Sequence, residues 1–300
     1  MRFSYWPRPV QPFDELCELA NAAADHGFGG VWLADHFMPD GEDTSAPFAE
    51  SWTTLSALSL AVPKIRIGPL VTGNTYRHPA VVAKMAATLD HISGGRVVLG
   101  LGAGWQENEH RQYGFEFGTL RNRLERLDEA CQVIKALYGE SVANFQGQYY
   151  QLTDATLEPK PVQKPLPLMI GGSGEKVTLR IAAKYADEWN TWGTVETLRQ
   201  KMAILDKHCA DVGRDPSAVS RSAAAIVFVS EDASTLKEMR SRTFPLATLV
   251  GTPDELADTM NQYQEAGVGE FILSGFNLVR ADAVKKVLET FGERIISKVQ

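Results

Sequence analysis

The sequence contains few cysteines, no long apolar run and no excess of basic residues, and each absence excludes a class of protein. Three cysteines occur among 300 residues, at Cys17, Cys131 and Cys209, with no Cys-x-x-Cys or Cys/His metal-binding spacing. A reducing compartment and no metal centre are therefore expected. No apolar stretch has the length of a signal peptide or of a bilayer-spanning helix. The net charge of −7 comes without a basic patch, which argues against nucleic acid or an anionic membrane as a partner. We therefore expect a cytoplasmic protein.

Short apolar runs alternate with amphipathic stretches of ten or more residues along nearly the whole chain. The length fits two average domains or one α/β barrel. Eight strands, each followed by a helical stretch, are predicted at 2–6, 29–34, 65–73, 96–104, 168–172, 188–192, 221–230 and 269–275. This pattern predicts a (β/α)8 TIM barrel with insertions rather than a doubly wound open sheet, because the units continue to the C-terminus without a second domain.

One segment breaks the alternation. Residues 145–152, FQGQYYQL, predict a hairpin, and four prolines follow before residue 168, which disfavours regular structure there. Because the strand–helix pattern resumes at 168, we interpret residues 140–166 as an insertion within a single barrel domain that spans residues 1–300.

Polar side chains occur where several predicted strands end, which is where the active site of such a barrel lies. Asp35 and His36 follow the second strand directly, and Thr72 and Asn74 lie at the end of the third. An aspartate in such a place can also cap a helix or turn, and for the Asp-His pair both interpretations stay open. Histidine exchanges a proton near neutral pH, which makes His36 a candidate general acid or base.

Two glycine-rich segments follow the fourth and fifth strands. IGGSGEK, residues 170–176, exposes backbone at the start of a helix, where amide groups attract anions. It predicts a phosphate-binding loop, although the P-loop spacing is absent. GLGAGW, residues 100–105, has G-x-G-x-G spacing and no clear helix after it, so it does not match a Rossmann dinucleotide motif. Its glycines would let the chain lie flat under a planar ring.

Taken together, these segments resemble the bacterial luciferase-like monooxygenase superfamily, and most closely its branch that uses the deazaflavin coenzyme F420. The matching stretches are residues 27–37 (GFGGVWLADHF), 73–110, 145–152, 158–190 and 265–273 (EAGVGEFIL). The resemblance implies a (β/α)8 barrel with F420 as cofactor, its ring in the mouth of the barrel, and a homodimer.

The resemblance also implies which residues hold this cofactor. The phosphate would lie on Gly171, Gly172, Ser173 and Gly174, with Glu175 and Lys176 at the helix start. Ala103 and Gly104 would lie against the ring, with Asn74 and Asn108 as polar contacts, and Asp35 would bond the polar edge of the ring. A backbone bulge, often a non-proline cis peptide, would fall near Leu70, Val71 or Thr72.

The substrate side departs from the pattern of the branch. Sugar-phosphate dehydrogenases of this branch carry a glutamate where this chain has Trp105, and their lysine pair for the substrate phosphate has no clear counterpart. This argues against a sugar phosphate. Trp105, Phe37 and Trp192 would instead form an apolar wall for a flatter or more apolar substrate.

The predicted reaction is hydride transfer between the deazaflavin and an alcohol, a ketone or an activated double bond. His36 would act as the general acid or base, Asp35 would orient the cofactor or the histidine, and Glu107 is a further catalytic candidate, with Glu109 close by. One alternative is a flavin mononucleotide (FMN)-dependent monooxygenase that uses reduced flavin and oxygen. Another is a non-catalytic member that binds a flavin.

Overall fold

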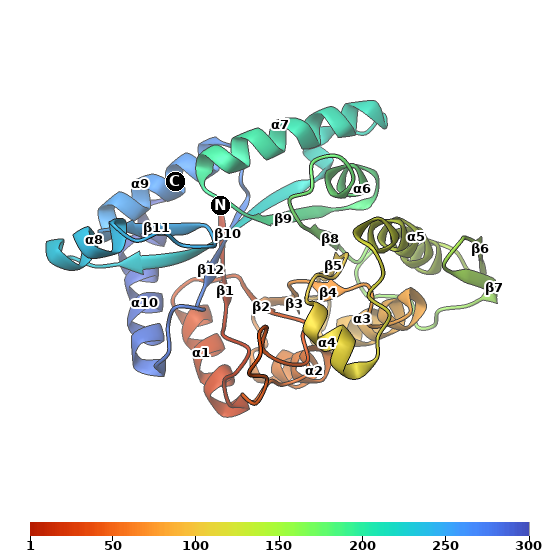
Figure 1. The fold of residues 1–300 in the computed structure, drawn as a ribbon, viewed down its shortest axis with the longest axis horizontal. Helices are drawn as coiled ribbons and strands as arrows, with labels where there is room; N and C mark the ends of the chain where they lie inside the picture. Colours follow the sequence, from red (N-terminus) through yellow and green to blue (C-terminus); the bar gives the residue numbers. More distant parts are fainter. Residues whose placement is uncertain (300) are drawn as a thin grey trace.

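Parallel strands form the centre of the molecule, a computed structural model that describes residues 1–299, and helices surround them (Figure 1). The strands pair in the order β3-β2-β1-β12-β10-β9-β8-β5-β4. An isolated parallel bridge between Ile67 and Val97 closes the ring from β3 to the chain before β5. The bounds are β1 (Arg2–Trp6), β2 (Gly30–Leu33), β3 (Arg66–Pro69), β4 (Thr72–Gly73), β5 (Leu99–Gly102), β8 (Leu168–Gly171), β9 (Glu188–Trp192), β10 (Ser220–Val229) and β12 (Glu270–Ser274).

The strands β3 and β4 are two halves of the predicted third strand, interrupted at Leu70 and Val71. The nine strands therefore fill eight positions around the barrel. The predicted (β/α)8 TIM barrel is confirmed.

Eight principal helices alternate with these strands. They are α1 (Phe13–Asp25), α2 (Ser51–Ala61), α3 (Pro79–Ser93), α5 (Leu120–Gly139), α6 (Thr178–Tyr185), α7 (Val195–Asp211), α9 (Pro253–Glu265) and α10 (Ala281–Arg294). A side-chain cap marks the start of five of them, α2, α3, α5, α7 and α9. The start of α9 shows why the sequence folds this way: the Thr252 hydroxyl accepts from the Glu255 N–H, and the Glu255 carboxylate accepts from the Thr252 N–H. None of the helices within residues 1–299 is long and apolar enough to cross a membrane.

The hairpin predicted between the fourth helix and the fifth strand is present. It consists of β6 (Ala143–Gln146) and β7 (Gln151–Ala155), which pair with each other as a separate antiparallel sheet. It projects at one end of the molecule (Figure 1). We propose that residues 140–166 are an excursion from a single barrel domain, since the strand–helix alternation resumes at β8.

Two elements lie outside the predicted pattern: α4 (Glu107–Tyr113) and β11 (Thr248–Gly251). The helical stretch expected after the seventh strand is present as α8 (Ala233–Arg240). The prediction that no clear helix follows GLGAGW is wrong, because α4 begins at Glu107. This helix is short and mostly polar, so its sequence carries no apolar periodicity. β11 pairs only with the outer half of β10, which extends beyond the barrel.

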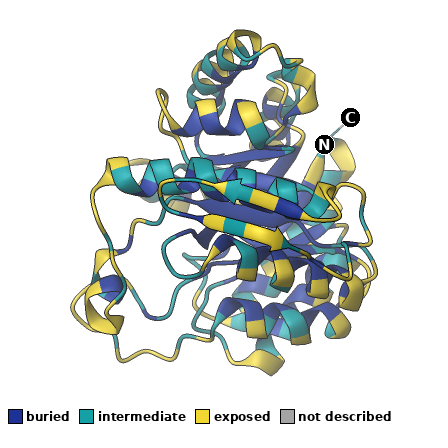
Figure 2. Ribbon diagram, turned by 90° about the vertical axis from the view of Figure 1, so that its right-hand side faces the viewer, coloured by how far each residue is buried: buried dark blue, intermediate teal, exposed yellow. Residues whose placement is uncertain are grey.

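Side chains of the barrel strands alternate between an outer core under the helices and a smaller cluster inside the barrel. The inner cluster consists of Trp6, Trp32, Ala34, Leu70, Val98, Met169, Ala224 and Ile272. Figure 2 shows that the barrel strands in the interior are mostly buried and that exposed residues lie on the outer faces of the helices and on the hairpin β6–β7. The inner cluster therefore fills the barrel and leaves its carboxyl-terminal mouth as the place for a ligand.

An ionic network closes the barrel below this cluster, near the amino ends of the strands. Arg66 donates to Glu188 and, at 3.2 Å, to Glu270. Glu270 also accepts from the Ser4 hydroxyl at 2.5 Å and from the Trp32 indole at 3.2 Å. Both carboxylates are buried, so they depend on these donors for their stability. We call Arg66, Glu188 and Glu270 the floor triad.

Candidate active site

The polar residues predicted at the strand ends meet on one side of the barrel mouth, after β2, β4 and β5. His36 and Glu109 form the centre of this site. The Nδ1 atom of His36 lies 2.7 Å from Oε1 of Glu109, and Oε2 of Glu109 accepts from the Phe37 N–H at 2.9 Å. The Tyr76 hydroxyl also donates to Oε1. Glu109 therefore has three donors and no exposed side-chain surface.

These contacts fix the protonation of the pair. Burial acts to raise the pKa of Glu109, but the hydrogen bonds from His36, Tyr76 and Phe37 outweigh it, so its pKa lies below the ordinary value. An ionised carboxylate only accepts, so Nδ1 of His36 carries the hydrogen that it shares with Glu109, and Nε2 is the ring nitrogen left to exchange a proton. Nε2 has no hydrogen-bond partner among the described residues. The ring edge of Trp105 covers His36, with the centroids 5.3 Å apart.

Tyr76 is expected to stabilise the fold through Glu109. Tyr76→Phe keeps the ring but removes a donor to a buried charge, so we expect the free energy of unfolding to fall by about 1.5–3 kcal/mol. Because the pKa of Glu109 is lower in the folded protein than its ordinary value of 4.5, ionised Glu109 stabilises the fold fully above pH 4.5. This stabilisation is lost as the pH falls through the folded-state pKa. The difference between variant and wild type should be full at neutral pH and shrink below pH 4.5. Urea unfolding at several pH values measures it.

Tyr113→Phe is the matched control, because Tyr113 packs in the same aromatic cluster but is 56% exposed. Its loss of a hydroxyl should change the free energy of unfolding by less than about 0.5 kcal/mol. Equal effects of the two substitutions would show that the Tyr76–Glu109 bond does not stabilise the ionised carboxylate.

Asp35 is occupied by a different partner. Both of its carboxylate oxygens accept from Arg77, at 2.7 and 3.2 Å, and Arg77 also donates to Glu50 at 2.7 Å. Burial raises the pKa of the Asp35 carboxyl, and Arg77 offsets this only in part. His36 is therefore hydrogen-bonded by Glu109 and not by Asp35. Of the two roles predicted for Asp35, orienting the histidine is not supported by a hydrogen bond, and orienting the cofactor stays a prediction.

Of the two acids after the fourth strand, Glu107 was the predicted catalytic candidate, but Glu109 is the one that contacts His36. Glu107 is exposed in the first turn of α4, whereas Glu109 is buried against His36. Side chains two positions apart on a helix point about 200° away from each other, so only one of Glu107 and Glu109 can face the mouth. The structure places Glu109, and not Glu107, in contact with the histidine.

Glycines form a flat floor beside these residues, around Val71, at the ends of the neighbouring strands β5 and β8. A Cβ on Gly102 would lie 2.6 Å from a methyl carbon of Val71, and a Cβ on Gly171 would lie 2.9 Å from both of its methyl carbons. The peptide bond between Leu70 and Val71 is cis, within the range where the resemblance suggested one. The side chains of Thr72 and Asn74 are buried. The Thr72 hydroxyl accepts a hydrogen bond from the Trp52 indole, and the Asn74 amide donates one to the Tyr150 hydroxyl.

The predicted phosphate loop precedes α6. Ser173, Gly174, Glu175 and Lys176 are exposed, and their backbone N–H groups have no hydrogen-bond acceptor within residues 1–299. Gly172 adopts a φ of +135° and donates to the Asn190 carbonyl, a conformation that favours glycine. The Glu175 carboxylate is bound to Lys201 at 2.6 Å, so the free groups of this loop are backbone amides and the Lys176 amine.

The remaining predicted contacts are spread over different parts of the mouth. Asn108 donates to the Pro39 and Gly41 carbonyls and so fixes the loop after β2. Ala103 is half-buried beside Gly104, whose carbonyl accepts from Arg123. Phe37 packs against Tyr76, Tyr113 and Phe115. Trp105 is 61% exposed, and Trp192 contacts Trp6. The predicted wall of Phe37, Trp105 and Trp192 is therefore not one surface.

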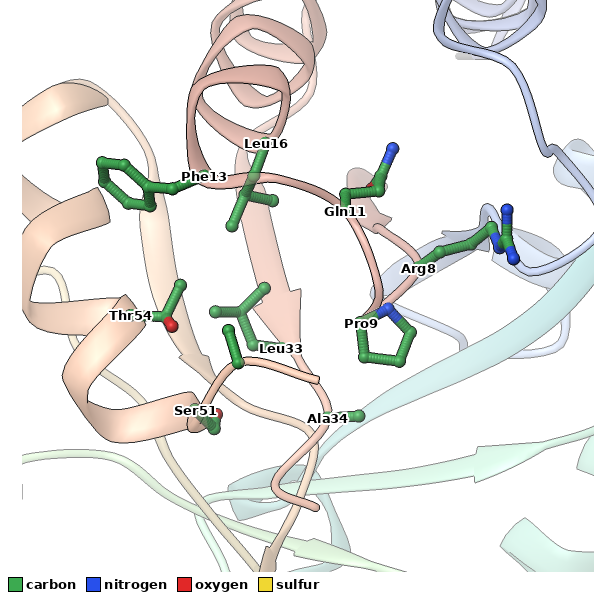
Figure 3. A pocket seen from close by; sticks show the side chains of 10 residues that line it. Arg8, Pro9, Gln11, Phe13, Leu16, Leu33, Ala34, Ser51 and Thr54 are labelled. Carbon is green, nitrogen blue, oxygen red and sulfur yellow. The ribbon is translucent and has the colours of Figure 1, made fainter. Parts of the chain in front are cut away.

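A small pocket lies beside the mouth, between the loop after β1 and the start of α2 (Figure 3). Leu16 and Leu33 point toward each other in it, while the Arg8 guanidinium points away from them. The buried Ser51 hydroxyl has no hydrogen-bond partner there. The pocket does not include His36 or Glu109.

The chain matches the model of the luciferase-like monooxygenase family over residues 1–246. It belongs to this family. The curated relatives include the F420-dependent glucose-6-phosphate dehydrogenase of Amycolatopsis mediterranei, 37% identical over 57% of this chain and 50% of that protein. The match thus spans about half the length of that relative. The enzyme of the same name from Microbacterium testaceum is 33% identical over 87% of this chain and 80% of its own.

A third relative is the F420-dependent hydroxymycolic acid dehydrogenase of Mycobacterium tuberculosis, 32% identical over 73% of this chain and 60% of that protein. Among solved structures, an F420-dependent secondary alcohol dehydrogenase in complex with an F420-acetone adduct superimposes with a TM-score of 0.85. It is 24% identical and covers 100% of this chain and 99% of its own. This likeness shows the same fold.

Proposed function

We propose that this protein is an F420-dependent oxidoreductase that transfers a hydride between the deazaflavin ring and a small alcohol, ketone or activated double bond. The observation that carries the proposal is the His36–Glu109 pair at the rim of a glycine-floored barrel mouth. The curated relatives named above support F420 as the cofactor. Solved structures with the same fold include proteins described as monooxygenases, which keeps FMN as the alternative to test.

The residues of the mouth fit such a cofactor. A planar ring needs a flat surface, and Val71 supplies one by packing directly on the backbone of Gly102 and Gly171, where its methyl groups leave no room for a Cβ. A phosphate needs hydrogen-bond donors, which the amides of residues 173–176 supply at the carboxyl end of β8. Ring and phosphate would thus lie on adjacent strands, β5 and β8, which pair directly.

In the reaction, bound F420 would supply the hydride acceptor or donor. His36 would accept the hydroxyl proton of an alcohol at Nε2, or return a proton to a carbonyl oxygen in the reverse direction. Glu109 holds the Nδ1–H of His36, which fixes the ring orientation and stabilises the imidazolium when it forms. Phe37 and Tyr76 keep Glu109 ionised by donating to it.

The proposal is tested by anaerobic assays with oxidised F420 and a panel of secondary alcohols, and by assays of reduced F420 with the corresponding ketones. We expect loss or gain of the F420 absorbance with these substrates and no oxygen consumption with reduced FMN. Oxygen consumption with reduced FMN and no reaction with F420 would favour the monooxygenase. Binding of either cofactor without turnover on any substrate would favour a non-catalytic flavin-binding member.

The glycine floor gives a separate prediction. Gly171→Ala places a methyl group 2.9 Å from both γ carbons of Val71, so the Val71 side chain must shift, at a cost of about 1–3 kcal/mol for such overpacking. Because the ring is proposed to lie on Val71, we expect this shift to weaken F420 binding by roughly tenfold, which is about 1.4 kcal/mol. Gly139→Ala is the control, because a Cβ there meets nothing within 4 Å. Fluorescence titration with F420 measures both. Unchanged affinity in Gly171→Ala would place the ring elsewhere.

We also propose that the protein acts in the cytoplasm as a homodimer, as the resemblance implies. Light scattering on the purified protein is expected to give twice the chain mass of 33.0 kDa.

A further inference from the structure

We propose that the substrate is an uncharged alcohol or ketone with an apolar carbon skeleton, and that it binds an aromatic wall formed by Trp6, Trp192 and Phe276. We further propose that Trp6 donates its indole N–H to an oxygen of this substrate. The inference rests on the proposed function and names the substrate class that the mouth would accept.

The aromatic wall comes from three separate strand ends on one side of the mouth. Trp6 ends β1, Trp192 ends β9 and Phe276 follows β12. The ring centroids of Trp6 lie 5.3 Å from Trp192 and 4.9 Å from Phe276, and those of Trp192 and Phe276 lie 6.1 Å apart. All three rings therefore form one continuous apolar surface.

Strand alternation places this surface inside the barrel. Ser4 reaches Glu270 of the floor triad inside the barrel, and Trp6, two residues on, faces the same way. β10, which lies between β9 and β12, contributes Ala224 beside Trp192. Because this side chain is small, the rings of Trp6 and Trp192 can meet across it. The aromatic wall is thus the upper edge of the inner cluster, where it borders the mouth.

Trp6 carries a second observation. Its side chain is 7% exposed, and its Nε1 is buried without a hydrogen-bond partner. Buried polar groups are nearly always hydrogen-bonded, and an exception calls for an explanation. Trp32, the neighbouring tryptophan of the inner cluster, satisfies its own Nε1 with Glu270. A ligand oxygen bound against the aromatic wall would satisfy Trp6 in the same way.

The charges around the mouth favour an uncharged ligand. Arg77 is neutralised by Asp35 and Glu50, and Lys201 is paired with Glu175. Arg8 comes two positions after Trp6 in the chain and forms no ion pair within residues 1–299. The test therefore includes Arg8 as a cation that could attract a charged substrate. A sugar phosphate would present a charge and several hydroxyls to three aromatic rings that offer a single unpartnered hydrogen-bond donor within residues 1–299, the Nε1 of Trp6.

The test compares propan-2-ol, cyclohexanol and glucose 6-phosphate as substrates of the F420-loaded protein. Because each methylene in an apolar pocket changes specificity by about tenfold or more, we expect kcat/KM for cyclohexanol to exceed that for propan-2-ol at least tenfold, with no turnover of glucose 6-phosphate. Trp192→Ala should remove most of this preference. Trp6→Phe, which keeps a ring but loses the N–H, should raise KM by about three- to tenfold. Arg8→Ala should change none of these values.

Saturation-transfer NMR with cyclohexanone and the protein without cofactor tests whether the aromatic wall binds a ketone, independently of activity. Transfer in the wild type that is lost in Trp192→Ala supports the inference even if F420 does not bind and the proposed function fails. No transfer in the wild type overturns it. A preference for glucose 6-phosphate that Arg8→Ala abolishes also overturns it, while leaving F420-dependent oxidoreduction intact.

Discussion

His36→Ala is expected to lower kcat by two to four orders of magnitude, the usual contribution of a positioned general acid or base. Binding of F420 should stay within roughly twofold of wild type, because the imidazole acts on the substrate proton and not on the cofactor. The basis is geometric: Nδ1 is held by Glu109, and Nε2 has no partner among the described residues. Steady-state kinetics and a fluorescence titration measure the two effects separately.

Glu109→Gln is the companion variant. Its amide keeps the size of the side chain but removes the charge that orients Nδ1–H of His36. We expect a smaller fall in kcat than for His36→Ala, of about 10–100-fold, by analogy with partners that orient a functional histidine. If His36→Ala abolished cofactor binding and left kcat unchanged, the histidine would be a binding residue and not the acid or base.

Arg66→Ala is expected to lower the free energy of unfolding by about 3–5 kcal/mol, because it leaves two buried carboxylates without their shared cation. Arg66 donates to both Glu188 and Glu270 of the floor triad. Burial already raises the pKa of Glu188, and Arg66 counteracts that rise. Without Arg66, the two glutamates would also repel each other. Urea unfolding followed by circular dichroism gives the change.

Arg2→Ala is the matched control, since Arg2 contacts the same Glu270 at 3.5 Å but is 48% exposed. Exposed ion pairs contribute about 0–1 kcal/mol, so this variant should be nearly as stable as wild type. Similar losses for Arg2→Ala and Arg66→Ala would mean that the floor triad is solvated and does not hold the barrel together.

The barrel could be predicted because its signal is repeated. Eight apolar runs, each followed by an amphipathic stretch, are hard to arrange otherwise, and the glycine-rich segments fall at strand ends where the fold puts its site. β11 and α4 lack this support. β11 pairs with only one strand, and α4 has one turn of polar residues before Tyr113, so neither produces a periodic pattern.

The partners within the site could not be predicted from the sequence, because they depend on side-chain direction. Glu107 and Glu109 are the same residue type, so the sequence does not distinguish them. The position at which α4 begins decides which of them faces His36. Asp35 and His36 are adjacent, yet they turn to Arg77 and Glu109, respectively. Tyr76 and Arg77 follow the third predicted strand in the sequence. Their roles could have been suspected because a buried carboxylate needs hydrogen-bond donors, and Tyr76 and Arg77 supply them to Glu109 and Asp35.

The aromatic wall shows the same limit. Trp192 was expected to line the substrate site with Phe37 and Trp105, since all three follow barrel strands. The register of β9, β10 and β12 instead joins Trp192 to Trp6 and Phe276. Trp6 carried no signal in the sequence, because a tryptophan that ends an N-terminal strand is usually a core residue.

Titration of the purified protein with oxidised F420 and, separately, with FMN, followed by fluorescence quenching, tests most directly whether the glycine-floored mouth holds a deazaflavin. We expect saturable binding of F420 at stoichiometric amounts, weakened in Gly171→Ala and unchanged in Gly139→Ala, with weaker binding of FMN. Tighter binding of FMN than of F420 would contradict the assignment and make oxygen-dependent chemistry the function to pursue.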